Sequence, residues 1–220
     1  HLQALEIALK LIKDTIDEYN YVISELNVGG GFGIKYTDED DKKPYAYFID
    51  PMMEKIEEFS KKMNIRRPEI VIEPGRSMVG EAGISLYTVG TIKDIKGIRK
   101  YVSVDGGMTD NIRPALYQAE YQGLIANKAD QAKKDLVTIS GKCCESGDVL
   151  IKDVYMPLAE RGDILAIFST GAYGYSMASN YNKNTIPAVV LVREGKSEII
   201  VKRQTYEQMI ANEVIPESLM

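Results

Sequence analysis

The stretch Ile70–Arg76, IVIEPGR, begins with three apolar β-branched residues and ends in a glutamate, Pro-Gly and an arginine. Such a run predicts a short strand. Upstream, apolar residues recur every three or four positions from Leu2 to Ile16 and predict a helix. A short strand, Glu25–Val28, and a second helix starting at Asp50-Pro51 come between them. This helix–strand–helix–strand order predicts a parallel sheet with crossover helices, as in a β/α barrel.

The pattern changes after about Gly80, where short β-rich runs dominate and a second type of domain is predicted. Residues 1–80 would be the C-terminal part of a β/α barrel, incomplete because a whole barrel takes ~250 residues. Residues 81–220 would form a C-terminal β domain, an antiparallel β-sandwich or Greek-key barrel. The expected fold class is therefore α/β plus all-β. The predicted strands are Ile84–Ile92, Tyr101–Val104, Leu136–Ser140, Ile164–Phe168, Ala188–Arg193 and Glu198–Lys202, with a hairpin turn at Arg193–Ser197 and a helix near Tyr206–Ala211.

Composition and charge exclude several classes of function. The net charge of -5 argues against nucleic acid as the main partner, because phosphate binding needs a basic surface. His1 is the single histidine, so catalysis by a Ser-His-Asp or Cys-His arrangement is not expected, and neither is a metal site. No apolar run reaches the roughly 20 residues that cross a bilayer, and no signal peptide is recognised. With two cysteines, the expected location is the reducing cytoplasm.

Two motifs fall at the ends of the first two predicted strands. A glycine run, GGGFG over Gly29–Gly33, allows backbone N–H groups to approach an anion closely, although a flexible turn explains it nearly as well. EPGR over Glu73–Arg76 adds a fixed carboxylate and a guanidinium, for which a structural salt bridge is an equal alternative. Barrels build their active sites at this end of the strands. The two motifs are therefore candidates for one binding site.

Further candidates lie in the second half of the chain. DGGMTDNIRPALY, Asp105–Tyr117, contains Arg113 and Tyr117; an arginine fork matches a carboxylate, so Arg76 and Arg113 suggest an amino-acid substrate. GAYGYSMASNYN, from Gly171, could be turns or binding loop. The adjacent Cys143 and Cys144 of GKCCESGD could form a redox pair or metal ligands, or supply a nucleophile or a proton donor.

Together these stretches resemble the C-terminal portion of the diaminopimelate decarboxylase family, pyridoxal-phosphate-dependent (PLP) enzymes with an alanine-racemase-like barrel. The matching motifs are GGGFG, EPGR, DGGMTDNIRPALY, CESGD and GAYGYSMASNYN, in this order. The resemblance implies PLP as cofactor, decarboxylation of meso-2,6-diaminopimelate to L-lysine and carbon dioxide, and a cytoplasmic homodimer whose active sites are shared across the interface.

The resemblance also implies a role for each matching residue. Gly31, with the backbone around Gly75 and Arg76 (and so Pro74), would hold the cofactor phosphate, and Glu73 would pair with the pyridine nitrogen. Cys144 would be the acid that returns a proton to the substrate carbon after carbon dioxide leaves. The substrate contacts would be Arg76, Arg113, Tyr117, Glu145 and Tyr173, and Tyr173 would touch the cofactor as well.

Two departures limit what the resemblance implies. The lysine to which the family attaches its cofactor lies earlier in the barrel and is not found here, so the 220-residue chain by itself is not expected to catalyse decarboxylation. Lys142 stands where the family usually has proline, which loosens one φ angle. A related ornithine, arginine or carboxynorspermidine decarboxylase stays open, as does a non-catalytic dimerisation or binding module. Glu145 favours diaminopimelate, because relatives acting on diamines tend to carry Asp there.

Overall fold

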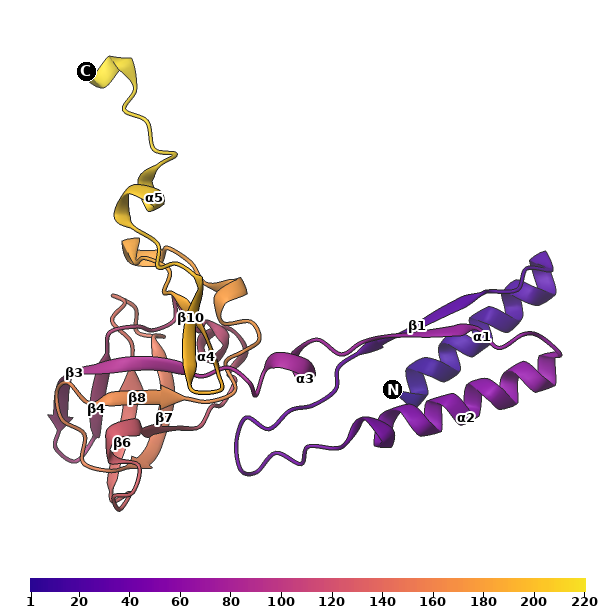
Figure 1. Cartoon of the computed structure of the whole chain (residues 1–220), viewed down its shortest axis with the longest axis horizontal. Coiled ribbons are helices and arrows are strands. Elements are labelled where there is room, and N and C mark those ends of the chain that lie inside the picture. Colours follow the sequence, from indigo (N-terminus) through magenta and orange to yellow (C-terminus); the bar gives the residue numbers. More distant parts are fainter. The chain divides into compact units, whose positions relative to one another are not determined.

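The computed structural model describes all residues, 1–220, and they form two compact units, His1–Val79 and Gly80–Met220 (Figure 1). None of the helices combines the length and the apolar character needed to span a membrane. The division falls between Val79 and Gly80. The assignment of the first unit to a cofactor-binding barrel and of the second to a β domain stays a prediction.

The first unit follows the predicted helix–strand–helix–strand order and ends in one helical turn. Its strands β1 and β2 pair in parallel, with Glu25 opposite Glu69 and Gly30 opposite Glu73. This parallel pair agrees with the rhythm of the sequence, since parallel strands need a crossover such as the helix between them. The elements are α1 (Leu2–Tyr19), β1 (Glu25–Gly30), α2 (Tyr45–Met63), β2 (Glu69–Glu73) and α3 (Arg76–Val79).

One apolar cluster holds this unit together. The repeating apolar positions of α1 and α2 face each other and the two strands, so the helical faces predicted from spacing form the core. Ile56 is fully buried, and burying a side chain of this kind contributes roughly 1.5–3 kcal/mol. The buried members are Leu5, Leu9, Ile12, Met52 and Ile56, against which Leu26, Val28 and Ile70 of the strands pack.

The predicted start of the second helix was wrong. Asp50 and Pro51 were expected to cap it, but α2 begins at Tyr45, so Pro51 lies inside the helix. The reason is tertiary packing, which overrides the local signal: the ring of Phe32 contacts Tyr45 and Phe48, with centroids 5.2 and 5.6 Å apart. These aromatic contacts stabilise the additional turn ahead of the proline.

The second unit is built on a six-stranded sheet in the order β5-β8-β3-β4-β6-β7 (Figure 1). The bounds of β3, β4, β6 and β8 differ from the predicted bounds by three residues or fewer, whereas β5 and β7 were not predicted. Apolar residues of the sheet form the core of this unit, in which Val102, Ile125, Ile139, Leu165 and Ile167 are fully buried. The strands are β3 (Ser85–Ile95), β4 (Arg99–Val104), β5 (Gly123–Ile125), β6 (Asp135–Ser140), β7 (Val149–Met156) and β8 (Ile164–Ile167).

The expectation of a purely antiparallel domain was wrong at one pairing. Strands β4 and β6 run parallel, with Val102 opposite Ile139, so the sheet is mixed. The helix α4 (Arg113–Tyr117) and the strand β5 lie between β4 and β6 in the sequence. The connection is therefore long enough for the crossover that parallel strands require. The sheet also curls until it is nearly closed: a Cβ on Gly123 of β5 would lie 3.2 Å from Cδ1 of Ile151 in β7.

The end of the chain forms a hairpin followed by short helices. Strands β9 (Val189–Arg193) and β10 (Lys196–Val201) pair antiparallel around Glu194-Gly195, which confirms the predicted turn. Both turn residues have positive φ, 52° and 74°, as a two-residue hairpin loop requires. The predicted terminal helix is α5 (Tyr206–Ile210), and the hydroxyl of Thr205 caps it by accepting from the Gln208 N–H.

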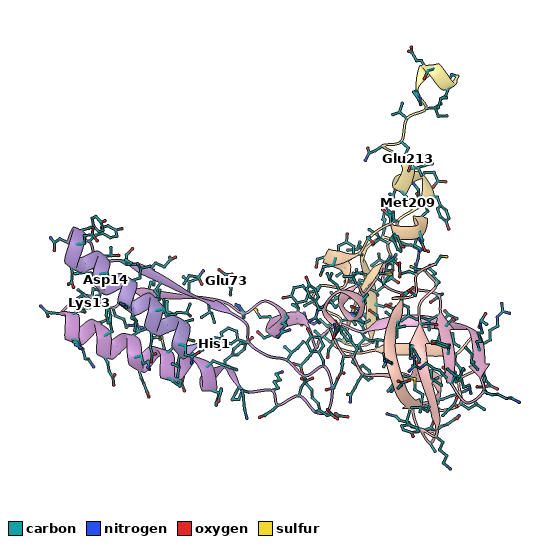
Figure 2. The ribbon with its side chains drawn as sticks, turned by 180° about the vertical axis from the view of Figure 1, so that it is seen from behind. His1, Lys13, Asp14, Glu73, Met209 and Glu213 are labelled. Atoms are coloured by element: carbon teal, nitrogen blue, oxygen red, sulfur yellow. The ribbon has the colours of Figure 1, made fainter.

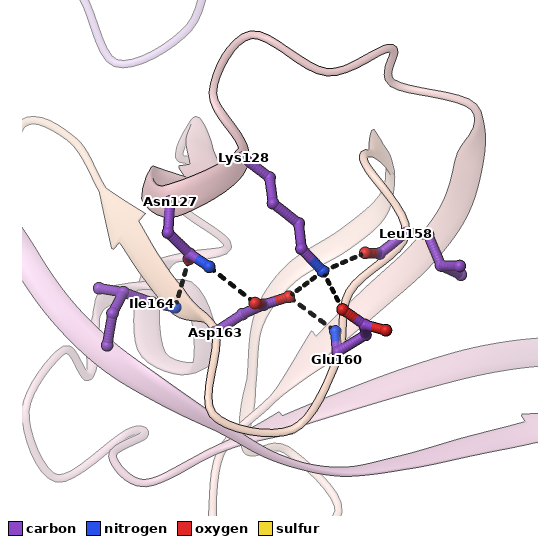
Figure 3. Close-up of polar contacts among 6 residues, drawn as sticks. All are labelled: Asn127, Lys128, Leu158, Glu160, Asp163 and Ile164. Atoms are coloured by element: carbon purple, nitrogen blue, oxygen red, sulfur yellow. Dashed lines mark hydrogen bonds and ion pairs between the residues drawn. The ribbon is translucent and has the colours of Figure 1, made fainter.

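A buried ion pair fixes the loop between β7 and β8 (Figure 3). The carboxylate of Asp163 lies 2.8 Å from Lys128 Nζ and accepts hydrogen bonds from the Asn127 amide (2.8 Å) and the Glu160 N–H (2.7 Å). Burial acts to raise the pKa of Asp163, but its bonds with Lys128 and Asn127 outweigh that effect and hold the pKa below its usual value. The carboxylate is therefore ionised in the folded protein at neutral pH.

Candidate active site

The glycine run and the EPGR segment lie beside each other because β1 and β2 are parallel. The carboxyl ends of both strands therefore meet at one edge of the first unit, where Gly30 pairs with Glu73. The backbones approach so closely that a Cβ on Gly30 would lie 1.8 Å from the Glu73 carbonyl oxygen. Any other residue would push the strands apart, so glycine at this position is a requirement of the fold.

The carboxylate of Glu73, at the end of β2 (Figure 2), is held by a residue that the sequence analysis missed. Asn27 donates a hydrogen bond from Nδ2 to Glu73 Oε1 over 2.6 Å, and its Oδ1 accepts from the Gly29 N–H over 2.8 Å. One amide thus fixes both the carboxylate and the start of the glycine run. The available signal was the asparagine two residues before a glycine, a pattern typical of a side chain that bonds its own loop.

Glu73 and Arg76 are bonded to other groups rather than to each other. The Arg76 guanidinium lies 5.7 Å from the centre of the Tyr36 ring, a cation–π arrangement, while Glu73 is bonded to Asn27. These two side chains therefore do not form the salt bridge that the sequence left open as an alternative.

The same edge has the features that PLP requires. Gly29, Gly31 and Gly75 have φ of 74°, 83° and 51°, and a Cβ on Gly29 would meet nothing within 4 Å, so no side chain of these glycines covers the backbone there, although the Gly29 N–H is already bonded to Asn27. Arg76 would supply positive charge for a phosphate, and Glu73 would supply a carboxylate for a protonated ring nitrogen. Residues of these types fit PLP.

A pocket of about 460 Å³ adjoins this edge of the first unit. Its polar groups are bonded to each other: the Tyr45 hydroxyl lies 2.8 Å from Ser77 Oγ, which donates to the Pro74 carbonyl over 2.6 Å. Pro74 is the predicted site residue that lines it, together with Tyr45, Ile72, Ser77 and Met78. The rest of its wall is apolar, and the pocket is shallow and open to solvent.

In the second unit, Arg113 is brought together with Tyr173. Arg113 begins α4, is 9% exposed, and donates from Nη1 to the Tyr121 hydroxyl over 2.8 Å. Its guanidinium lies 5.2 Å from the centre of the Tyr173 ring, although the two residues are sixty positions apart in the sequence. Tyr173 adopts a φ of 66°, an uncommon backbone conformation for a tyrosine. Tyr117, at the end of α4, is 62% exposed.

The two cysteines lie in the loop between β6 and β7 and differ in environment. Cys143 is partly buried and its sulfur accepts from Asn184 Nδ2 over 3.6 Å, whereas Cys144 is exposed. Burial raises the pKa of the Cys143 thiol, and the nearby charge of Asp148 adds to the effect, so this thiol stays protonated at neutral pH. The exposed Cys144 is the better placed of the two to meet a ligand.

Cys144 and Glu145 are both bonded to backbone or side chains around them. The Cys144 N–H donates to Asn182 Oδ1 over 2.7 Å. The Glu145 carboxylate accepts from the Gly147 N–H over 3.1 Å and from the Tyr181 hydroxyl over 3.4 Å. The bond from Gly147 lowers the pKa of Glu145, so this carboxylate is negatively charged at neutral pH.

The predicted site residues are divided equally between the two units. The first unit holds Gly31, Glu73, Pro74, Gly75 and Arg76, and the second holds Arg113, Tyr117, Cys144, Glu145 and Tyr173. The structure brings together the glycine and EPGR segments in one unit, and Arg113 with Tyr173 in the other. Their functional roles stay predictions.

Comparison with known proteins identifies the family. Residues 20–171 match the pyridoxal-dependent decarboxylases over their C-terminal sheet domain, and the chain belongs to this family. Diaminopimelate decarboxylase of Bacillus subtilis is 50% identical over 207 residues, covering 94% of this chain and 47% of that protein. The enzyme of Staphylococcus aureus is 51% identical over 205 residues, covering 93% and 48%.

Solved structures agree with this assignment. The diaminopimelate decarboxylase of M. jannaschii, crystallised with L-lysine, superposes with a TM-score of 0.91 at 34% identity and covers 99% of this chain and 49% of that one. A lysine/ornithine decarboxylase of Vibrio vulnificus has a TM-score of 0.66 at 21% identity, which shows a shared fold. The chain spans about half the length of the curated relatives it matches.

Proposed function

We propose that this chain supplies the C-terminal half of a PLP-dependent decarboxylase that converts meso-2,6-diaminopimelate to L-lysine and carbon dioxide. The observation that carries the proposal is the pairing, in one chain, of a carboxylate-and-glycine edge suited to PLP with an exposed Cys144-Glu145 loop. Identity of about one half to diaminopimelate decarboxylases over nearly the whole chain supports it.

The first unit holds the cofactor in this proposal. Backbone N–H groups at Gly31 and Gly75 bind the phosphate, with Arg76 adding charge, and Glu73 bonds the protonated ring nitrogen, fixed in place by Asn27. When bound, PLP supplies an electron sink for the charge left on the substrate carbon as carbon dioxide departs. We further propose that this unit is the end of a β/α barrel and that the second is a Greek-key β domain.

The second unit supplies the proton and the grip on the substrate. As the bond from the substrate carbon to its carboxylate breaks, the electron pair stays on that carbon. The Cys144 thiol then donates its proton there, which forms the new C–H bond and leaves a thiolate that solvent reprotonates. Glu145, Arg113 and Tyr173 bind and orient the substrate in this scheme.

Charge favours a substrate with an amino-acid group at its far end. Diaminopimelate carries there both an ammonium and a carboxylate. The anionic Glu145 suits the ammonium, whereas Arg76 and Arg113 suit the carboxylate through their planar forks. Ornithine lacks that second carboxylate and would leave an arginine without its partner. Tyr117 is proposed as a further contact at this end.

The proposal includes a homodimer in which Cys144 and Glu145 of one subunit complete the site of the other. The cytoplasm, expected from the two free cysteines, is part of the same proposal.

The experiment is release of labelled carbon dioxide by the protein as its gene encodes it, supplied with PLP. We expect meso-diaminopimelate to yield carbon dioxide and lysine in equal amounts, and ornithine and arginine to yield at most a small fraction of that rate. Release from ornithine but not from diaminopimelate would identify a diamine-forming relative instead. Release from no amino acid would favour the non-catalytic module.

A further inference from the structure

The carboxylate of Asp148 connects two loops of the second unit that lie forty residues apart. Asp148 is 3% exposed, and its two oxygens have different partners. Oδ1 accepts from the Met108 N–H over 2.7 Å, in the loop between β4 and α4. Oδ2 accepts from the Cys143 N–H over 2.8 Å, in the cysteine loop. A single buried side chain thus holds the backbone next to Cys144 against the segment that leads to Arg113.

Glycines make room for this carboxylate on both sides. A Cβ on Gly107 would lie 2.4 Å from Asp148 Oδ2, and one on Gly141 would lie 2.1 Å from the same oxygen. The loops are also joined directly, because the Lys142 N–H donates to the Gly106 carbonyl over 2.9 Å. The two glycine-containing segments therefore surround Asp148 closely, and neither can accept a side chain without displacing its carboxylate.

We propose that Asp148 is a positioning residue for Cys144. Its two charge-assisted hydrogen bonds make the cysteine loop and the loop before Arg113 one rigid support, so that the backbone next to the proton donor is held in place. The effect on catalysis rests on the proposed function. The rigid link between the two loops is independent of it. A buried carboxylate suits the task because it offers two acceptors and no donor.

Two substitutions break the link by different means. Asp148→Asn replaces one acceptor oxygen by an NH₂ group, which cannot accept from the N–H that it faces. Gly141→Ala keeps the carboxylate but displaces it, because the new Cβ would overlap Oδ2. Asp163→Asn is the matched control: it alters a buried carboxylate of the same unit, 6% exposed, that accepts the Glu160 N–H and lies in another loop.

The first measurement is amide hydrogen exchange in the protein as its gene encodes it. We expect exchange to accelerate by about tenfold at both Met108 and Cys143 in Gly141→Ala, and at whichever of these two amides faces the new NH₂ group in Asp148→Asn, as loss of a hydrogen bond to a charged acceptor implies. In Asp163→Asn neither amide should accelerate more than the other slowly exchanging amides of this unit, because the variant lowers overall stability without touching the link. Equal acceleration in the control, or no acceleration in either link variant that folds, would overturn the proposal.

The second measurement separates positioning from binding. With diaminopimelate, both link variants should lower kcat while KM stays near the wild-type value, and Asp163→Asn should change neither. A rise in KM at unchanged kcat would assign Asp148 to substrate binding and overturn the positioning role. If wild type does not decarboxylate diaminopimelate, the proposed function fails, but the exchange measurement still decides whether Asp148 links the loops.

Discussion

Replacing Cys144 by alanine is expected to lower kcat for decarboxylation by about 10²–10⁴-fold, the usual contribution of a positioned general acid. The thiol is the group proposed to protonate the substrate carbon, and alanine has no proton to give. Because Cys144 is exposed and its backbone N–H bonds Asn182, the substitution leaves the loop's hydrogen bond in place. Carbon dioxide release at saturating diaminopimelate measures the effect.

The neighbouring cysteine provides the control. Cys143→Ala removes a thiol that is partly buried and held protonated, so kcat should stay close to wild type. A small loss of stability is expected because the thiol contacts Asn184. The assignment of the proton donor fails if Cys144→Ala retains wild-type kcat, or if the Cys143 variant loses more activity than the Cys144 variant.

Asp163→Asn is expected to lower the free energy of unfolding by about 1–3 kcal/mol at pH 7, because it removes the charged acceptor of hydrogen bonds from Lys128, Asn127 and the Glu160 N–H. Lys128, 13% exposed, would lose its buried partner and keep the Leu158 carbonyl and the exposed Glu160 carboxylate. Urea unfolding measures the change. Glu213→Gln is the control: it breaks an exposed pair with Lys183 and should cost less than about 1 kcal/mol.

The pH dependence of this difference has a definite sign. Because the folded protein lowers the pKa of Asp163, its stabilisation is fully present above the unfolded value of about 3.9 and is lost as pH falls through the folded pKa. The gap between wild type and Asp163→Asn should therefore shrink on acidification below about pH 4. A gap that widens in acid, or a variant no less stable than Glu213→Gln, would contradict the ion pair's role.

Local patterns in the sequence predicted the elements whose signals are local. Apolar spacing identified both helices of the first unit, and a parallel pair followed from their alternation with strands. The turn at Glu194-Gly195 was predictable because glycine there permits the backbone that a tight hairpin needs. The edge formed by Gly30 and Glu73 follows from the same reasoning, since both residues end parallel strands.

What could not be predicted depends on contacts between distant segments. The start of α2 at Tyr45 depends on packing against Phe32, and the parallel pairing of β4 with β6 depends on the course of the chain between them. Asp148 follows a glycine in a loop and looks like an ordinary turn residue. Its burial becomes evident only when the Met108 and Cys143 loops meet around it.

We propose that Glu73 acts in one subunit's site and that Cys144 of the partner subunit completes this site. Two inactive variants, combined in one dimer, test this sharing of residues. Glu73→Ala and Cys144→Ala subunits, each with its own tag, would be co-expressed and purified by both tags, so that every dimer is mixed. Each variant alone should be nearly inactive, and the mixed dimer should regain about half the wild-type activity, because one of its two symmetric sites is intact. Mixed dimers as inactive as the two single-variant dimers would contradict the proposal that the subunits share their active sites.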